Sequence, residues 1–564
     1  MKKRQLAVLS LSASTLTFLC LAASAEPTWE ENESISSQGR ENPLNLSPQE
    51  MHDSALRGRR HALNYPVSIT GEALPLEAAL RFFDSGNSKN LLDLLQGFFK
   101  KAIRVETFSD VEALVGLIDY PEEEGQGVYH VPFPEGKKPW YRMGTSMINA
   151  PEGRALTFSC ASCHAGDLFG KKVIGLTNRF PRANEFFLSG RAATRFVAPE
   201  MFRAATKSSP AETAMYRRLR ENAQYIDGRM PLVRGLDTSL AHVALSLARR
   251  APDSNAGKDP ASQRSPRDTL LRHQPADSKP AVWWNVKYKN RWLLDGSVVA
   301  GNPIFTNILW NEIGRGTDLT ELSSWLSENQ AVVDDLTAVV FSAQAPAFLD
   351  FFPEEHFSLE RVKKGQRLFS ENCAFCHGNY IKGFQRAETS GMSKRDLLKT
   401  IRVEYHSNTP VVNVGTDPLR AQGMISLAEP LNRLEVSRRN GIVVKVQQGY
   451  VPPPLVGIWA RWPYLHNNSV PNLCALLTAS AQRPVRWDVG EARSKATDFD
   501  ASCNGYPLGE KAPKAWSANR WGHFDTRRKG LSNQGHDEGI VTKNGREKFT
   551  SDEKLALIQY LQTL

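Results

Sequence analysis

The chain has 564 residues and a formal net charge of +10, from 70 Lys and Arg against 60 Asp and Glu. This length is too great for one small domain and indicates about three structural units. No run rich in Lys and Arg stands out, so nucleic acid is not an expected partner. A mildly basic surface suits an acidic partner protein, or simply keeps the chain soluble.

The first 25 residues are typical of a cleaved signal peptide. The basic start Lys2–Arg4 precedes the apolar stretch Leu6–Ala22, and Ala23–Ala25 forms an A-x-A cleavage site. The apolar stretch is short and ends in small residues, which favours a signal peptide over a membrane span. Cys20 lies in this stretch without the small-residue context of a lipoprotein site. We therefore expect a periplasmic or secreted protein with no membrane span after cleavage.

Residues 26–341 form the predicted N-terminal unit. The pattern of Leu76–Ile103 is helical, residues 251–268 are polar and rich in turn formers, and Thr320–Phe341 is again helical. Signals for strands are few and short. This unit is expected to be a haem domain with insertions, for the reason that follows.

Two short segments carry most of the chemical information. Cys160–His164 and Cys373–His377 both read C-x-x-C-H, the attachment signal of c-type haem. The two thiols add to the vinyl groups of one porphyrin, and the adjacent His binds iron from one face. A zinc site would need two more ligands nearby, and a redox C-x-x-C has no use for the His. Two covalently bound haems are therefore predicted, on Cys160, Cys163, His164, Cys373, Cys376 and His377.

The remaining cysteines also suit an exported protein. Without Cys20 and the four motif cysteines, only Cys474 and Cys503 are left. An oxidising compartment favours a disulfide between them. Two unpaired buried thiols are the alternative.

Residues 342–564 form the predicted C-terminal cytochrome c domain. Ser342–Pro353 contains two Pro and is expected to link the two units, and Ser358–Ser370 is expected to be a helix that leads into Cys373. A capping box at Thr550–Glu553 predicts a last helix, and Gly365 would let the two helices cross closely. The last helix is expected to present one apolar face, made by Leu555, Ile558 and Leu561.

The expected fold class is thus mainly α, with two c-type cytochrome-like haem domains, long irregular loops and few short strands. The second axial position of each iron then decides the function. Two strong ligands give an electron-transfer haem, whereas an open side lets oxygen or peroxide react. His536, in a Gly-flanked loop before the last helix, and His466 are the candidates for the C-terminal haem. Taken alone, a His in such a position is more often a structural, hydrogen-bonded residue than a ligand.

Several segments resemble the bacterial di-haem cytochrome c peroxidase superfamily, and most closely its branch of large di-haem cytochromes that includes the rubber oxygenases. The most specific match is the pair Pro452–Ala460 and Pro463–Asn467, similar to P-L-x-G-x-W-A followed by P-x-L-H-N-G-S-V-P-x-L. One departure is Asn468, which replaces the usual Gly but tolerates a left-handed backbone. Further similar segments are Ala281–Asn285, Leu294–Gly296, Val414–Pro418 and Asn533–His536.

The resemblance implies a division of labour. The haem on His164 would react with oxygen or peroxide, and the haem on His377 would be six-coordinate and pass electrons. In the large branch the second ligand lies in the late G-H loop, which maps to His536. In the peroxidase branch an aromatic residue lies between the haems, and Trp283 and Trp284 are its candidates; ordinary core packing is the alternative for both.

The distal side of the His164 haem is less defined by the sequence. A peroxidase needs an acid or base near the bound peroxide. The acidic run Glu122–Glu124 could supply it, with His130 nearby in sequence, although such a run is more often a solvated turn. A dioxygenase would instead need an apolar pocket, for which the candidates are Phe169, Phe180 and Phe305.

The preferred hypothesis is a peroxidase-like oxidoreductase. Peroxide would be reduced at the His164 haem, with electrons from a small c-type cytochrome or cupredoxin arriving through the His377 haem. Oxidative cleavage of a hydrophobic polymer such as polyisoprene, or of another organic substrate, by dioxygen is the second hypothesis. A non-enzymatic electron carrier with both irons blocked is the third. The sequence leaves the substrate, the electron donor and the oligomeric state open.

Overall fold

A computed structural model describes residues 28–84, 106–250, 270–519 and 522–564. The predicted signal peptide, the predicted loop at 251–268 and residues 85–103 of the first predicted helix lie outside these ranges. Within them, no helix is both long and apolar enough to cross a bilayer. The described chain is mainly helical, as the sequence predicts.

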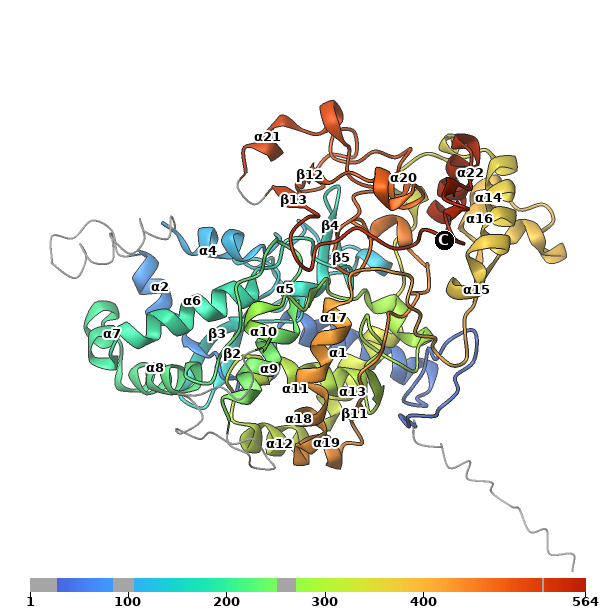
Figure 1. Ribbon diagram of the computed structural model, residues 1–564. Helices are drawn as coiled ribbons and strands as arrows, with labels where there is room; N and C mark the ends of the chain where they lie inside the picture. The colour runs from blue at the N-terminus through green and yellow to red at the C-terminus, as the bar shows by residue number, and fades with distance from the viewer. Residues whose placement is uncertain (1–27, 85–105, 251–269, 520–521) are drawn as a thin grey trace, which may run out of the picture.

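In the N-terminal part, α1 and α13 form a closely packed pair near the middle of the view, and α6, α7 and α8 lie together to its left (Figure 1). The helix α1 begins with a capping box in which Ser47 accepts from the backbone N–H of Glu50, and it packs against α13. Gly58 makes this approach possible, because a Cβ there would lie 2.0 Å from the carbonyl oxygen of Asp335. The helices of this part are α1 (Pro48–Leu63), α2 (Leu76–Asp84), α4 (Phe108–Val115), α5 (Ala161–His164), α6 (Ala183–Phe196), α7 (Pro199–Thr206), α8 (Pro210–Ala223), α9 (Leu240–Ala248), α10 (Leu270–His273), α11 (Pro303–Gly314), α12 (Leu319–Glu328) and α13 (Gln330–Phe341).

The helix predicted over Thr320–Phe341 is two helices, so that prediction is wrong in its continuity. The chain leaves the helical conformation at Asn329, between α12 and α13. The Asn329 side chain donates to the carbonyl of Trp325 at 2.8 Å. An Asn side chain that bonds the nearby backbone competes with the helical hydrogen bonds, which accounts for the break.

In the C-terminal part, α14 (Leu359–Asn372) and α22 (Ser551–Gln562) cross beside α15 (Ala374–His377), as Figure 1 shows. The predicted close approach at Gly365 is confirmed, because a Cβ there would lie 2.0 Å from the carbonyl oxygen of Ala556. The capping box of Thr550 and Glu553 is also confirmed. The other helices are α16 (Lys394–Lys399), α17 (Leu419–Gln422), α18 (Ala428–Arg433), α19 (Glu435–Arg439), α20 (Leu473–Leu476) and α21 (Lys514–Ser517).

The buried face of α22 is only partly the one predicted. Ile558 and Leu561 are buried, whereas Leu555 is 38% exposed. Leu557 and Tyr560 complete the buried face instead. These positions recur every three to four residues, so the helical period holds but the face is rotated toward Tyr560.

Strands are short but more numerous than the sequence indicates. The largest sheet has three strands in the order β1-β3-β2, with Met147 opposite Leu156 in the β2–β3 hairpin. Other strands pair in twos, and most join segments that are close in sequence. Their bounds are β1 (Leu74–Pro75), β2 (Thr145–Ala150), β3 (Gly153–Phe158), β4 (Ala165–Leu168), β5 (Lys171–Ile174), β6 (Thr238–Ser239), β7 (Asp277–Ser278), β8 (Val298–Ala300), β9 (Asn379–Lys382), β10 (Ile401–Glu404), β11 (Val443–Val444), β12 (Arg486–Asp488), β13 (His523–Asp525), β14 (Thr542–Lys543) and β15 (Arg546–Glu547).

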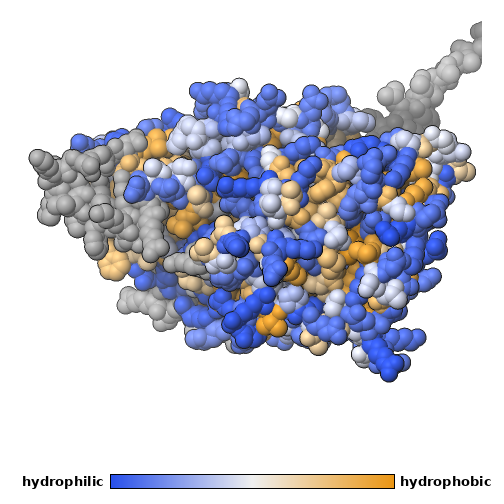
Figure 2. All heavy atoms as spheres, turned by 90° about the horizontal axis from the view of Figure 1, so that it is seen from above, coloured by the Kyte–Doolittle hydropathy of each residue, from blue (hydrophilic) through white to orange (hydrophobic). Residues whose placement is uncertain are grey.

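One hydrophobic core runs through both predicted units. Phe169 of the N-terminal unit, for example, packs edge-on against Phe351 and Phe499 and stacks on Trp462. On the face shown in Figure 2, apolar residues are interspersed with hydrophilic ones. The large apolar side chains therefore hold the two units together.

The first described segment, residues 28–45, joins distant parts of the chain. The backbone N–H of Ile35 donates to the carbonyl of Ser407 at 3.1 Å. Arg40 donates in the same way to Lys287 at 2.8 Å, and Gly301 donates to Trp29, also at 2.8 Å.

Candidate haem sites

The C-terminal motif is one helical turn at the end of α14. Cys373 donates its N–H to Phe369, and the N–H of His377 donates to the carbonyl of Cys373 at 3.0 Å. This turn sets two thiols three residues apart and the imidazole just after them, as attachment to a single porphyrin requires. Phe375, between the two thiols, is 89% exposed.

The imidazole of His377 is oriented by the backbone. Its Nδ1 lies 2.9 Å from the carbonyl oxygen of Pro453, so Nδ1–H donates and Nε2 is left for a metal. Loss of solvation lowers the pKa of His377 to about 4, with Pro453 opposing the shift. The ring is therefore neutral at neutral pH, which is the form that binds iron.

His536 lies close to His377, although the two are far apart in sequence. The N–H of His536 donates to Val414 at 3.0 Å, and its φ of 59° follows a Gly535 with a φ of 98°. Its Nδ1 is buried and has no hydrogen-bond partner among the described residues. Burial and the neighbouring His377 lower the pKa of His536 to about 3. A neutral imidazole held near His377 fits the predicted second axial ligand.

His466, the alternative ligand, has a packing role. Its ring stacks on Tyr450 with centroids 4.0 Å apart. Burial lowers its pKa to about 3, and the cations Arg420 and Lys279 contribute. Of the two histidines, His536 is the one on which His377 acts electrostatically.

The N-terminal motif follows a hairpin instead of a long helix. It begins just after β3, and His164 donates its N–H to the carbonyl of Cys160 at 3.0 Å. The motif therefore forms one helical turn, α5, with the same spacing of thiols and imidazole as the C-terminal motif. Burial raises the pKa of Cys160 to about 11 and raises that of Cys163 as well. Both thiols are therefore protonated at neutral pH in the haem-free chain.

The ring of His164 lies against Trp283, with centroids 5.8 Å apart and an interplanar angle of 39°. Gly175 fixes this contact: its N–H donates to His164 at 2.7 Å, and its carbonyl accepts from Trp283 at 3.0 Å. A Cβ on Gly175 would lie 3.1 Å from that of Trp283. Desolvation lowers the pKa of His164 to about 4, with the carbonyl of Ala281 opposing it.

The short 3-10 helix η2 (Trp283–Tyr288) connects the two motifs. The indole of Trp284 donates to the carbonyl of Val456 at 2.8 Å, and the side chain of Asn285 donates to Pro454 at 2.7 Å. Pro454 adjoins the residue that orients His377. Trp283 thus contacts the N-terminal motif, while Trp284 contacts the segment whose Pro453 carbonyl orients His377.

The groups suggested for the distal side of His164 are occupied elsewhere. Glu122 pairs with Lys138 at 2.6 Å on the surface. Glu124 accepts the N–H of Phe133 at 2.6 Å and lies 3.8 Å from His130. This arrangement is the solvated turn that was the alternative. Of the three Phe residues suggested for an apolar pocket, Phe169 and Phe305 are part of the main core.

Sequence reasoning missed three titratable groups near the N-terminal thiols. Arg315 and Tyr65 act electrostatically on Cys160, and Asp237 acts on Cys163. The guanidinium of Arg315 lies 4.3 Å from the Tyr65 ring centroid and donates to the carbonyl of Phe158 at 2.9 Å. Burial raises the pKa of Asp237 to about 7. Their long separations in sequence left no local signal.

The side chains of the two motifs have the chemistry that binding of c-type haem requires. Each motif offers two thiols on one helical turn beside a neutral imidazole, and His536 adds a buried, unpartnered nitrogen near His377. Within the described ranges, no group of three or more His, Cys, Asp or Glu side chains is arranged to hold a metal ion.

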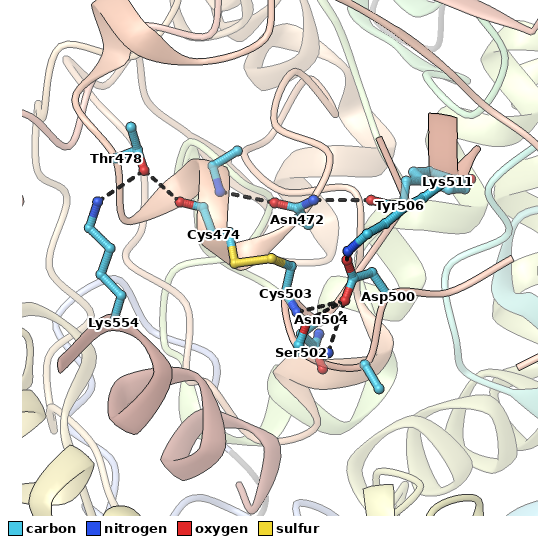
Figure 3. Close-up of a disulfide and its surroundings, with 12 residues drawn as sticks. Asn472, Cys474, Thr478, Asp500, Ser502, Cys503, Asn504, Tyr506, Lys511 and Lys554 are labelled. Carbon is cyan, nitrogen blue, oxygen red and sulfur yellow. Dashed lines mark hydrogen bonds and ion pairs between the residues drawn. A yellow bond between two sulfur atoms is a disulfide. The ribbon is translucent and has the colours of Figure 1, made fainter. Parts of the chain in front are cut away.

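The predicted disulfide between Cys474 and Cys503 is confirmed. It ties α20 to a turn in which Asp500 accepts the N–H groups of Ser502 and Cys503, at 3.0 and 3.1 Å (Figure 3). The four motif cysteines form no disulfide.

Comparison with known proteins adds a family match. Residues 449–488 match a family described as RoxA-like, cytochrome c-like. The chain carries a c-type cytochrome segment. This match contains Pro452–Ala460 and Pro463–Asn467, the most specific of the similar segments. At a coarse level it supports a rubber-oxygenase-like cytochrome c oxidoreductase that binds haem c.

Two relatives come from Sinorhizobium fredii, and both are named only as uncharacterized proteins. One, y4iJ, is 35% identical over 247 residues, which cover 36% of this chain and 38% of the relative. The other, y4iM, is 25% identical over 231 residues, which cover 38% of this chain and 52% of the relative. The matched regions thus span about two-fifths to half of these relatives.

Proposed function

We propose that the protein is an exported di-haem c-type cytochrome with peroxidase-like activity. The haem on His164 is the reactive one, and the haem on His377 supplies its electrons. The observation that carries the proposal is η2, which contacts His164 through Trp283. Through Trp284 and Asn285 it contacts the segment whose Pro453 carbonyl orients His377. When bound, c-type haem supplies the redox-active iron.

The surroundings of the two proximal histidines support different roles. His377 has His536 close by, which suits two strong axial ligands and an electron-transfer haem. His164 instead has the Trp283 ring beside it, with centroids 5.8 Å apart. An open side at His164 would leave room for a small oxidant.

The need for electrons favours a peroxidase. Reduction of one H₂O₂ to two H₂O takes up two electrons and two protons, so the reactive centre must be connected to a donor. The contacts from His164 through η2 to Pro454 and Pro453 give a packed connection to His377. We infer that Trp283 and Trp284 couple the two centres.

The exposed Phe375 suits electron entry at the C-terminal motif, because a redox protein could approach the haem edge there. A small c-type cytochrome or cupredoxin with an acidic surface is the proposed donor. The predicted signal peptide and the Cys474–Cys503 disulfide support a periplasmic or secreted location.

A dioxygenase is the second candidate, favoured by the RoxA-like match. It would use dioxygen to cleave an organic substrate such as polyisoprene. Glu122 and Glu124 were suggested as the acid or base of a peroxidase, but both are engaged in a surface turn, which also favours this second candidate.

The test uses the mature protein made with haem-maturation machinery. Mass spectrometry should find two covalent haems, and carbon monoxide or cyanide should bind one of them. Turnover of peroxide with a reduced cytochrome, lost in His164→Ala, would support the peroxidase. Oxygenated cleavage products from polyisoprene latex without peroxide turnover would support the dioxygenase. If neither haem binds an added ligand in either redox state, both enzyme proposals fail and an electron carrier remains.

A further inference from the structure

Four cationic side chains are buried between the two motifs without a carboxylate partner. Arg179, Lys279, Lys289 and Arg461 are each at most 9% exposed. We call this set the interior cation cluster. Lys279 donates to the carbonyl of Pro463 at 2.6 Å, and Arg461 donates to that of Pro454 at 3.2 Å.

The remaining contacts of the cluster are also with neutral groups. Arg179 donates to the carbonyl of Trp462 at 3.2 Å, and its guanidinium lies 3.9 Å from that ring's centroid. Its Nη2 is buried without a partner. Lys289 makes no side-chain hydrogen bond within the described ranges. Asp167, which acts electrostatically on Arg179, is already paired with Lys172.

Neighbouring charges within the cluster are close enough to repel one another. Arg461 and Arg179 both lower the pKa of Lys279. Arg461 also lowers the pKa of Lys289, which burial brings to about 8. Buried charges of one sign are costly unless opposite charges accompany them.

Some other buried cations in this chain are paired with acids. Arg420 pairs with Asp295 at 3.1 Å, and Lys287 pairs with Glu41 at 3.0 Å. Lys382 is a solitary buried cation, satisfied by two backbone carbonyls. The interior cation cluster differs from both patterns because several cations share one place without countercharge.

The position of the interior cation cluster, between the two haem motifs, indicates which group could supply the opposite charge. Arg179 follows Asn178, whose N–H donates to Cys163 of the first motif. Arg461 acts electrostatically on His377 of the second. Lys279 and Lys289 flank η2, between the two.

We propose that the interior cation cluster binds the propionate groups of the two haems. Each porphyrin carries two propionates on the edge opposite its thioether bonds, so two haems bring four carboxylates to four cations. Arg461 and Lys289 serve the His377 haem, and Arg179 and Lys279 serve the haem on His164. This assignment rests on the proposed presence of two haems.

The test measures the midpoint potential of each haem in the holoprotein by spectroelectrochemistry. Lys289→Met is the first variant, because loss of this amine leaves no carbonyl unpaired. Removing a positive charge beside a propionate favours the ferric state, so the potential of the His377 haem should fall. Lys279→Met should lower the other potential instead. Resonance Raman spectra should show shifted propionate bending modes in both variants.

Lys382→Met is the matched control, since it removes a buried lysine outside the cluster and should change neither potential. If Lys279→Met does not accumulate, Lys279→Arg keeps the charge and should retain the potential while moving the Raman mode. Unchanged potentials and Raman modes in variants that hold two haems would overturn the assignment. A wild-type protein without two haems would overturn the proposed function, and this assignment with it.

Discussion

Replacement of Gly365 by Ala should destabilise the C-terminal cytochrome region. In α14, the added methyl group would lie 2.0 Å from the carbonyl oxygen of Ala556 and 2.9 Å from Cβ of Tyr560. Carbon–oxygen contacts are comfortable only from roughly 3.3 Å. The obstructing atom belongs to the backbone of α22, so the two helices must separate by more than about 1 Å.

The expected cost follows from this separation. Overpacking costs about 1–3 kcal/mol and occasionally more, and a gap of about 1 Å also forfeits up to half of the dispersion energy between facing atoms. Leu557 and Tyr560, almost fully buried on α22, would lose such contacts. The better helix propensity of Ala returns about 1 kcal/mol. A net loss of about 2–3 kcal/mol is expected.

Gly190→Ala is the matched control, because Gly190 lies within α6 and a Cβ there has nothing within 4 Å. It should stabilise the protein by about 0.5–1 kcal/mol. The assay is guanidinium unfolding of the holoprotein, followed at the Soret band and compared by midpoint. If Gly365→Ala unfolds at or above the wild-type midpoint, the close-approach argument is wrong.

Three further outcomes can be measured. His536→Ala should convert one low-spin haem to high-spin in the EPR spectrum; if His466→Ala does this instead, the ligand assignment is wrong. The double variant Cys474→Ser, Cys503→Ser opens a loop closed over a separation of 29 residues, so unfolding should become easier by about 3.5 kcal/mol; an unchanged midpoint would mean that the bridge contributes nothing. N-terminal sequencing of the exported protein should begin at Glu26, and a retained Met1 would contradict signal cleavage.

Features determined by neighbouring residues were predictable. The C-x-x-C-H turns, the capping box at Thr550 and the small residue at Gly365 each express a short-range rule, and the structure contains the elements they predict. The disulfide was predictable because few cysteines remained after the motifs. The helix break at Asn329 and the exposure of Leu555 were not predictable. The first depends on a side-chain bond to one carbonyl, and the second on how the last helix packs.

Features that depend on distant residues were only partly predictable. His536 was selected through a resemblance, and only the fold brings it near His377. Arg315, Asp237 and the interior cation cluster carry no local pattern at all. An isolated Arg or Lys in a sequence is expected to lie at the surface. No neighbouring residue indicates that several of them will be buried together.

The first described segment constrains the order in which this protein can mature. Ile35 bonds to Ser407, about 370 residues later. At roughly 5–20 residues per second, synthesis of the intervening chain takes about 20–70 s. For that time Ile35 has no native partner, although Lys287 and Gly301, which bond Arg40 and Trp29, are made earlier. Both haem motifs precede Ser407 in the chain, so each can meet the attachment machinery before this segment docks.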